Sequence, residues 1–279
     1  MAVKLWKSKD AARCIIVPSA LDHKYSRGTL GVITGSAKYP GAAVLTSRAA
    51  FATGIGALRF HSNSGLAHLV LHQSPEAIVQ PGQVTAWLAG SGIDGKKYSD
   101  FTTWLRHRWF VLLNRQSVPT VLDAGAVHLA GSLEQPTVIT PHAGELSRLL
   151  SQRGVIASAE LIESNPRHWA QEASQLLAVT VVLKGSKTVV AQDEYVIELP
   201  TGTPWLATAG SGDVLAGIIG ALVATNYIEI LNDVSHLADV AATGAFIHNL
   251  AAVKASQGGP ITATSIIDAI PQAVASILK

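Results

Sequence analysis

Four short segments of the chain combine small residues with a polar or charged side chain that could do chemistry. The first is Gly210-Ser211-Gly212-Asp213, which leads into an Ala/Ile/Leu-rich run. Glycines at a helix start leave main-chain N–H groups open, and such groups bind anions such as phosphate. Asp213 can accept the proton of a hydroxyl that attacks phosphorus, or it can simply cap the helix. The segment therefore predicts a phosphate site with a candidate base.

The other three segments also follow short apolar runs. In Thr140-Pro141-His142-Ala143-Gly144-Glu145, His142 can donate to a ligand and Glu145 can hold magnesium through water. The plain alternative is a turn histidine followed by a first-turn glutamate that the helix dipole favours. Lys184 ends an apolar run and either neutralises phosphate or extends into solvent. The small residues of 35–44 either leave room for a bulky ligand or pack a helix closely on a sheet.

The elements that must position these segments alternate between short β-type runs and Ala-rich helical runs. This alternation predicts βαβ units and a mainly parallel sheet covered on both faces. Ligands bind beyond the carboxyl ends of such strands, and all four segments lie at strand-to-helix junctions, so a nucleotide or phosphate site is the favoured interpretation. We expect strands at residues 31–34, 57–60, 67–71, 84–89, 120–123, 138–140, 180–184, 188–191 and 195–199, the last two forming a hairpin. We expect helices at residues 41–53, 98–115, 144–150, 166–177, 212–224, 235–255 and 263–278.

Composition narrows the class of protein. Charged residues make up 14% of the chain and the net charge is +2, which argues against a nucleic-acid partner. Cys14 is the only cysteine, so an intrachain disulfide and a cysteine-based zinc site are excluded. The uncharged stretch at 214–228 is shorter than the ~18 residues of a membrane span, and the apolar run at 14–17 is too short for a signal peptide. We expect a soluble cytoplasmic protein of one α/β domain, with apolar residues 241–252 at a subunit interface.

Two familiar phosphate-binding motifs are nearly present at one place. Residues 90–95 fit GxGxxG after an expected strand, but the acidic residue that a dinucleotide fold needs ~20 positions on is missing. Residues 90–97 nearly fit a P-loop, but Lys97 stands where Ser or Thr would hold magnesium. A glycine turn close to a ligand is the preferred interpretation.

Taken together and in order, the motifs resemble a known family. They are GS-x-x-YPGAA at 35–43, LDA at 122–124, TPH-x-GE at 140–145, KG-x-x-T at 184–188 and GSGDVLAG at 210–217. This order is similar to that of the ADP-dependent NAD(P)H-hydrate dehydratases of the ribokinase-like superfamily, from about Lys24 to the C-terminal helices. The resemblance implies a three-layer α/β/α sandwich over residues 1–279. The epimerase domain often fused N-terminally in this family is not expected, because the chain is too short to hold it.

The resemblance also implies an activity. The family repairs the S-epimer of hydrated NADH or NADPH: ADP phosphorylates the ring hydroxyl, and phosphate then leaves to restore the double bond. The products would be NAD(P)H, AMP and phosphate, with Mg²⁺ as the metal and a homo-tetramer as the assembly. Two other functions stay open: a ribokinase-like kinase of a vitamin precursor or sugar, which rests on GSGD alone, and a catalytically silent nucleotide-binding protein.

Site roles follow from the resemblance, residue by residue. Asp213 would be the base, and the anion hole would consist of Gly210, Ser211 and Gly212. The adenine nucleotide would contact Lys184, Gly185, Ser186, Lys187, Thr188 and Gly212. The hydrated dinucleotide would contact Ala42, Gly92, His142 and Asp213. Glu145 would help to hold Mg²⁺ through water.

The chain departs from the family pattern at three places. Ala209 replaces a glycine before the GSGD motif, and alanine would be strained there if the position required a positive φ. Gly125 replaces the second aspartate of an LDADAL pattern, so the role of that carboxylate is in question. Gly90-Ser91-Gly92 replaces a GPG-type turn.

Overall fold

The structure, a computed structural model, describes residues 3–95 and 100–279. Within this range nine strands form one sheet in the order β1-β9-β8-β7-β6-β5-β4-β2-β3. All neighbouring strands are parallel except where β8 pairs antiparallel with β7 and β9. The strands are β1 (Val3–Leu5), β2 (Thr29–Ile33), β3 (Ala57–Phe60), β4 (Ala86–Ala89), β5 (Thr120–Leu122), β6 (Thr137–Ile139), β7 (Thr180–Leu183), β8 (Val189–Gln192) and β9 (Tyr195–Glu198).

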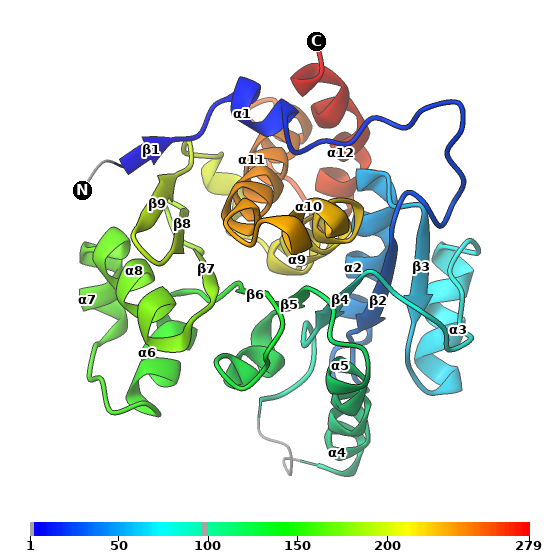
Figure 1. Cartoon of the computed structure of the whole chain (residues 1–279), viewed down its shortest axis with the longest axis horizontal. Coiled ribbons are helices and arrows are strands. Elements are labelled where there is room, and N and C mark those ends of the chain that lie inside the picture. Colours follow the sequence, from blue (N-terminus) through cyan, green and yellow to red (C-terminus); the bar gives the residue numbers. More distant parts are fainter. Residues whose placement is uncertain (1–2, 96–99) are drawn as a thin grey trace.

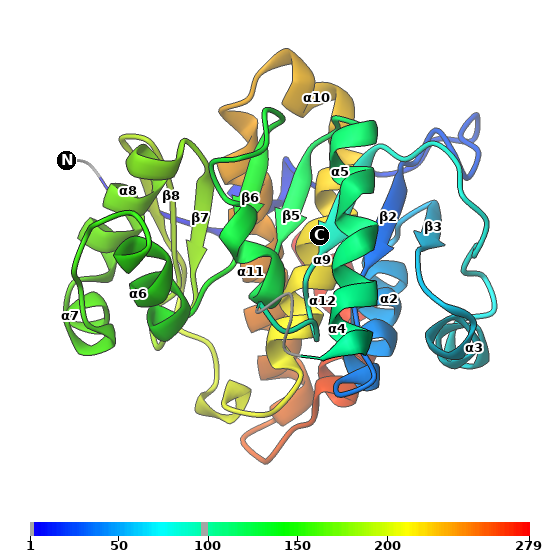
Figure 2. The same ribbon diagram turned by 90° about the horizontal axis from the view of Figure 1, so that it is seen from below.

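Helices cover both faces of the sheet, so the expected three-layer α/β/α arrangement is confirmed (Figure 1). One layer consists of α2 (Pro40–Thr53), α9 (Ser211–Thr225), α11 (His236–Ser256) and α12 (Ala263–Ile277). The other contains α4 (Phe101–His107), η1 (Arg108–Phe110), α5 (Val111–Arg115), η2 (Ala124–Leu129), α6 (Ala143–Ser151), α7 (Ala159–Ser164) and α8 (Pro166–Leu177). The remaining helices are α1 (Ser8–Ala12), α3 (Ser64–Gln73), η3 (Pro204–Leu206) and α10 (Tyr227–Asn232). Figure 2 shows α3 at one edge of the sheet and α7 and α8 at the other.

The core consists of two apolar clusters, one on each face of the sheet. Successive residues of a strand point to opposite faces. In β4, Ala86 and Leu88 accordingly pack into one cluster while Trp87 and Ala89 pack into the other. Because both faces are buried, the central strands are mostly apolar, as the sequence predicted, and the charged strand residues lie in β1, β3 and β9 near the edges of the sheet.

The helix α9, which begins at the GSGD motif, packs closely on α2. A Cβ added at Gly217 would lie 2.5 Å from the Thr46 carbonyl oxygen and 2.8 Å from the Ala49 Cβ. The glycine therefore lets the two helix backbones approach each other. This contact ties the start of α9 to the helix that carries the YPGAA motif.

The expected strand at 67–71 is wrong, because the segment is part of α3. Its buried residues Leu66, Ala67 and Val70 recur at helical spacing, and the Asn63 side chain caps the helix by accepting from the Leu66 N–H. A short apolar run cannot distinguish a strand from a buried helix face.

Two other expectations need correction or restriction. The helix expected at 98–115 is interrupted by the 3₁₀ turn η1, and its start at Tyr98 lies outside the described residues, as do Lys96 and Lys97. Residues 241–252, expected at a subunit interface, lie in α11 and are mostly buried within the chain. None of the described helices has the length and apolar character needed to cross a membrane.

Candidate functional site

The candidate site lies at the carboxyl ends of β5, β6 and β7. Asp123 follows β5, His142 follows β6 and Lys184 follows β7. The extended segments after β6 and β7 continue side by side, because the Lys184 N–H donates to the Pro141 carbonyl at 2.9 Å. Parallel strands thus deliver polar side chains from distant parts of the sequence to one edge of the sheet.

Asp123 is the hydrogen-bonding centre of this edge. Its side chain is buried, with Oδ1 accepting from Thr140 Oγ1 at 2.6 Å and Lys184 Nζ at 3.1 Å. Its Oδ2 accepts from Ser91 Oγ at 2.8 Å. The sequence analysis quoted Asp123 in a motif but gave it no role. The signal was present, since an acidic residue directly after a buried strand is costly unless it has partners.

Lys184 carries the positive charge of the site. Its Nζ lies 3.1 Å from Asp123 Oδ1 and 3.9 Å from Glu145 Oε2. Burial acts to lower the pKa of Lys184, but the attraction of Asp123 and Glu145 outweighs burial and the pKa is raised. The ammonium group is therefore charged at neutral pH and is available to an anion.

The start of α9 places open main-chain N–H groups beside this lysine. Gly210 is the N-cap residue and has a φ of +85°. A Cβ added at Gly212 would lie 3.6 Å from Lys184 Nζ, an ordinary contact distance, so the start of α9 and the ammonium group are neighbours. Ala209 is not among the residues of positive φ, which removes the strain considered for it. The glycine motif thus brings a helix N-terminus and an ammonium group together, a combination that binds phosphate.

Asp213 lies in the first turn of α9. Burial and, after it, the charge of Asp123 raise the pKa of this carboxyl to about 7, although Lys184 acts in the opposite direction. A carboxyl with a pKa near neutrality can accept a proton from a substrate and release it again. The local charges therefore suit Asp213 to proton transfer.

His142 and Glu145 begin α6 as a capping box. The His142 N–H donates to Glu145 Oε2 at 3.0 Å, and His142 Nδ1 accepts from the Gly144 N–H at 3.1 Å. The His142 side chain is exposed, whereas that of Glu145 is mostly covered. The predicted helix-start roles are thus present, and the other ring nitrogen, His142 Nε2, lies 3.6 Å from Glu145 Oε2.

Two cavities flank this cluster. One, of about 550 Å³, lies along Lys184, Gly185, Ser186, Thr188, Ser211 and Gly212 and extends to α11. The other, of about 530 Å³, lies between the segments after β4 and β5 and the helix α6, with Glu145 in its wall. Lys187, expected at the nucleotide, lines an adjoining cavity of about 260 Å³ beside α7 and α8, which shares Lys184, Gly185 and Ser186 with the first cavity.

Ala42 and Gly92 lie together on the other side of the cluster. A Cβ added at Gly92 would lie 2.4 Å from the Ala42 Cβ and 3.3 Å from the Gly35 Cα, so these small residues form one closely packed wall. The Gly35 N–H donates to the Ser91 carbonyl at 2.7 Å and joins the turns after β2 and β4. At Gly125 an added Cβ would lie 2.1 Å from the Ile93 carbonyl oxygen. The backbone around Gly125 therefore leaves no space for the aspartate of the family pattern.

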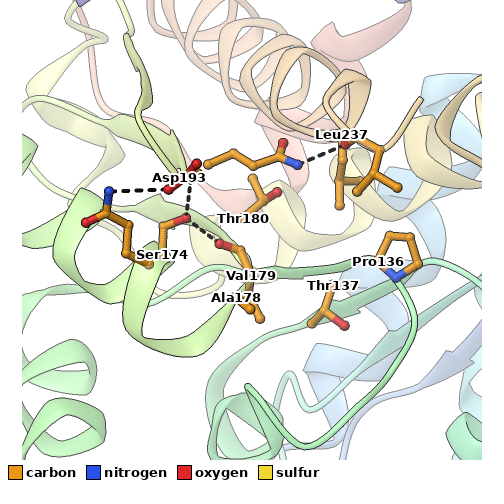
Figure 3. A pocket seen from close by; sticks show the side chains of 11 residues that line it. Pro136, Thr137, Ser174, Ala178, Val179, Thr180, Asp193 and Leu237 are labelled. Carbon is orange, nitrogen blue, oxygen red and sulfur yellow. Dashed lines mark hydrogen bonds between the residues drawn. The ribbon is translucent and has the colours of Figure 1, made fainter. Parts of the chain in front are cut away.

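A further cavity, of about 280 Å³, lies at the opposite end of the strands, near the amino ends of β6 and β7 (Figure 3). Its polar side chains mostly bond to groups of the same wall: Ser174 Oγ donates to the Val179 carbonyl and accepts from the Asp193 N–H. Gln175 Nε2 donates to Asp193 Oδ1 at 3.3 Å. We assign this cavity no part in the site.

Comparison with known proteins gives consistent results. Residues 30–272 match a family described as NAD(P)H-hydrate dehydratase. The chain is 37% identical over 234 residues to the bifunctional NAD(P)H-hydrate repair enzyme Nnr of Mycobacterium tuberculosis, covering 79% of this chain and 46% of that protein. It is 30% identical to the ADP-dependent (S)-NAD(P)H-hydrate dehydratase of Neisseria meningitidis serogroup B, covering 85% of this chain and 80% of that protein.

The fold is similar to that of the ADP/ATP-dependent NAD(P)H-hydrate dehydratase of Bacillus subtilis, which was co-crystallised with ATP and Mg²⁺. The TM-score is 0.83 at 24% identity, with 99% of each chain covered. Against the bifunctional relatives, by contrast, this chain spans about half of their length.

Proposed function

This chain belongs to the NAD(P)H-hydrate dehydratase family, and from that premise we propose that it repairs the S-epimer of hydrated NADH and NADPH at the expense of ADP. The observation that carries the proposal is the position of Asp213. Its carboxyl, with a pKa raised to about 7 by burial and by Asp123, stands at the open N-terminus of α9 next to Lys184. This arrangement supports transfer of a phosphoryl group to a hydroxyl.

The proposed reaction has two steps. In the first, the ring hydroxyl attacks the β-phosphorus of ADP and the bond from that phosphorus to the bridging oxygen breaks, so AMP leaves while Asp213 accepts the hydroxyl proton. In the second, the C–O bond breaks, phosphate leaves with the electron pair and the ring releases a proton to restore the double bond. Phosphorylation is needed because hydroxide is a poor leaving group and phosphate is a good one. The main-chain N–H groups of Gly210, Ser211 and Gly212 would stabilise the charge on the transferring group.

We place ADP in the cavity of about 550 Å³ that Lys184, Gly185, Ser186, Thr188 and Gly212 line. Such a volume lies within the ~300–1,000 Å³ of typical ligand pockets. The hydrated dinucleotide would lie against Ala42 and Gly92 and reach His142 and Asp213. Lys187 would approach the nucleotide from the adjoining cavity of about 260 Å³, which shares Lys184, Gly185 and Ser186 with the nucleotide cavity.

Mg²⁺ fits this site as a metal brought by the nucleotide. Among the described residues no group of three or more acidic, histidine or cysteine side chains could hold a metal ion. Mg²⁺ commonly uses only one or two carboxylates together with phosphates and waters. Glu145, engaged by the His142 N–H and near Lys184, would contact it through water. Bound there, the metal would neutralise phosphate charge. The resemblance further implies a homo-tetramer, which light scattering of the purified chain can test.

Product analysis tests the proposed reaction. Purified protein is incubated with hydrated NADH, ADP and Mg²⁺, and the products are followed by phosphorus NMR. We expect AMP and inorganic phosphate to appear in equal amounts together with NADH. A stable phosphorylated alcohol without free phosphate would instead identify a kinase, and no consumption of ADP or ATP would contradict phosphoryl transfer altogether.

A further inference from the structure

Arg106 is a buried cation that the proposed chemistry has not used. It lies on α4, and only 2% of its surface is exposed. Its guanidinium donates to three carbonyl oxygens: Nε to Gly35 at 2.8 Å, Nη2 to Thr34 at 2.8 Å and Nη1 to His61 at 3.1 Å. These bonds join α4 to the segments that follow β2 and β3.

The charge of Arg106 has no counter-charge in the protein that the structure describes. Within residues 3–95 and 100–279, none of the ion pairs includes Arg106. Burial lowers the pKa of Arg106 to about 10, so the side chain is still charged at neutral pH. A buried cation without a carboxylate costs several kcal/mol even when neutral dipoles surround it. Among the described residues, the charge of Arg106 is therefore surrounded by neutral carbonyl groups only.

Of the three carbonyl groups that Arg106 holds, that of Gly35 belongs to the wall proposed for the dinucleotide, and that of Thr34 directly precedes it. Gly35 has a φ of +76°, and its N–H donates to Ser91. Its Cα also lies 3.3 Å from the position of a Cβ on Gly92, the residue that touches Ala42. A shift of the turn at Gly35 would therefore move this wall directly.

The charge balance of the site gives the buried cation a second role. Three carboxylates, Asp123, Glu145 and Asp213, lie around one ammonium group, that of Lys184. The hydrated dinucleotide carries a diphosphate, and the NADPH form carries an additional phosphate. Such an anion enters an acidic site more easily if a positive charge stands behind the wall.

We propose that Arg106 is a positioning residue for the hydrated dinucleotide: it fixes the turn of Thr34 and Gly35 behind the substrate wall, and the anionic substrate supplies the counter-charge that no carboxylate among the described residues provides. The inference rests on the proposed function, which supplies the dinucleotide. It gives Arg106 no contact with the reacting atoms and no part in binding ADP.

Two variants separate the hydrogen bonds from the charge. Arg106→Gln keeps amide donors and removes the charge, whereas Arg106→Lys keeps the charge and loses the planar fork. KM is measured for hydrated NADH, hydrated NADPH and ADP, and NADPH binding is measured by its fluorescence. For Arg106→Gln we expect KM of hydrated NADH to rise about tenfold, equivalent to about 1.4 kcal/mol, with a larger rise for hydrated NADPH and a change below about twofold for ADP. For Arg106→Lys we expect equal rises for the two hydrates.

Arg59→Gln is the matched control. Arg59 also donates to three carbonyl oxygens, those of Gln83, Gln80 and Pro81, but at an exposed site. We expect its variant to keep every KM of the wild type.

Three outcomes decide the inference. Wild-type KM values for both hydrates in Arg106→Gln, or a parallel rise for the hydrates and ADP, would overturn it. If Arg106→Gln does not fold, an unchanged KM for the hydrates in Arg106→Lys overturns it equally. If the wild type does not turn over hydrated NADH, the proposed function fails. The role of Arg106 is then tested by NADPH binding alone. Equal dissociation constants of NADPH for the wild type and the Arg106 variants would overturn the role of Arg106.

Discussion

Asp213 shows how a single residue gains its chemistry from its neighbours. An aspartate in water is ionised at neutral pH and is a weak base. Burial at the start of α9 and the charge of Asp123 raise its pKa to about 7. The positive charge of Lys184 acts to lower the pKa of the same carboxyl, so Asp213 can still ionise near neutral pH.

The role of Asp213 as a base predicts a pH profile. A base must be deprotonated, so kcat/KM of the wild type should rise with pH through about 7 as the carboxyl loses its proton. Asp213→Asn should lower turnover ~10²-fold or more, the scale of a lost general base. Asp268→Asn, at an exposed aspartate that pairs with Arg48, should retain wild-type turnover. A variant at Asp213 with near-normal turnover would remove the residue from the mechanism.

Asp213 should also reduce stability while it serves catalysis. Because its folded-state pKa is raised above its ordinary value of 3.8, the native state binds the proton more tightly than the unfolded chain does. The resulting stabilisation is fully present below pH 4 and is lost as pH rises through about 7. Asp213→Asn should therefore raise the free energy of unfolding by about 1–3 kcal/mol at pH 8 and by little at pH 4. Urea unfolding at both pH values measures the difference in the free energy of unfolding. A variant that is less stable than the wild type at pH 8 would show that the charged Asp213 carboxylate does not destabilise the native state.

At the residue scale, sequence patterns found side chains with local signals and missed those without one. Lys184, His142, Glu145 and Asp213 stand at strand ends or helix starts, where topology brings them together whatever their separation in sequence. Arg106 was missed because an arginine on a short helix usually faces solvent, and only tertiary packing places it under three carbonyls.

At the scale of elements, the close contact of α9 with α2 holds the anion-binding end of α9 next to the substrate wall. Gly217 is in this contact, and an added Cβ would meet a backbone oxygen that cannot move aside easily. Small side chains of α2, such as Ala42 and Ala49, are buried at or near it. The small residues noted in the sequence thus allow α2 and α9 to pack closely against each other.

Gly217→Ala should destabilise the protein by about 1–3 kcal/mol, because overpacking outweighs the better helix propensity of alanine. Gly41→Ala, in the first turn of α2, is the matched control: an added Cβ there meets nothing within 4 Å. The control should be neutral or stabilising by up to about 1 kcal/mol. Thermal unfolding compares the two variants, and equal stability of both would mean that the helix contact is not tight.

The elements themselves differ in how well sequence specified them. The strands of the hairpin, β8 and β9, and the long helices α9, α11 and α12 were predicted within a few residues, because their patterns are long or bounded by clear turns. The segment of α3 was assigned to a strand because its cap at Asn63 was overlooked. The interior position of α11 depends on α1, α9 and α12 covering it, which no local pattern records.

At the scale of the whole molecule, two buried histidines tie stability to pH. Burial lowers the pKa of His61 and of His248 to about 4. Below pH 6.5 these histidines bind protons in the unfolded chain but stay neutral in the native state. The free energy of unfolding therefore falls as pH drops from 6.5 to about 4. Asp213 acts in the opposite direction over the same range, which leaves a net loss of stability in acid.

His61→Phe tests this linkage. Its ring lies against Trp87 and Trp109, so phenylalanine should fit the space. A pKa lowered from 6.5 to about 4 corresponds to about 3 kcal/mol, and the variant should lose less stability than the wild type between pH 7 and 4 by up to that amount. Chemical unfolding at the two pH values measures the difference. Identical losses in both proteins would show that His61 accepts a proton in the native state.

In the proposed arrangement, the nucleotide cavity and the substrate wall lie on either side of a charged cluster, at one edge of one sheet. The measurement that tests this account most directly is the near-ultraviolet absorbance of the dihydronicotinamide ring after hydrated NADH is mixed with the enzyme and Mg²⁺, with ADP, with ATP or with neither. The account predicts recovery of the absorbance with ADP, none without a nucleotide and almost none with Asp213→Asn. Recovery that does not need a nucleotide, or that is undiminished in Asp213→Asn, would contradict it.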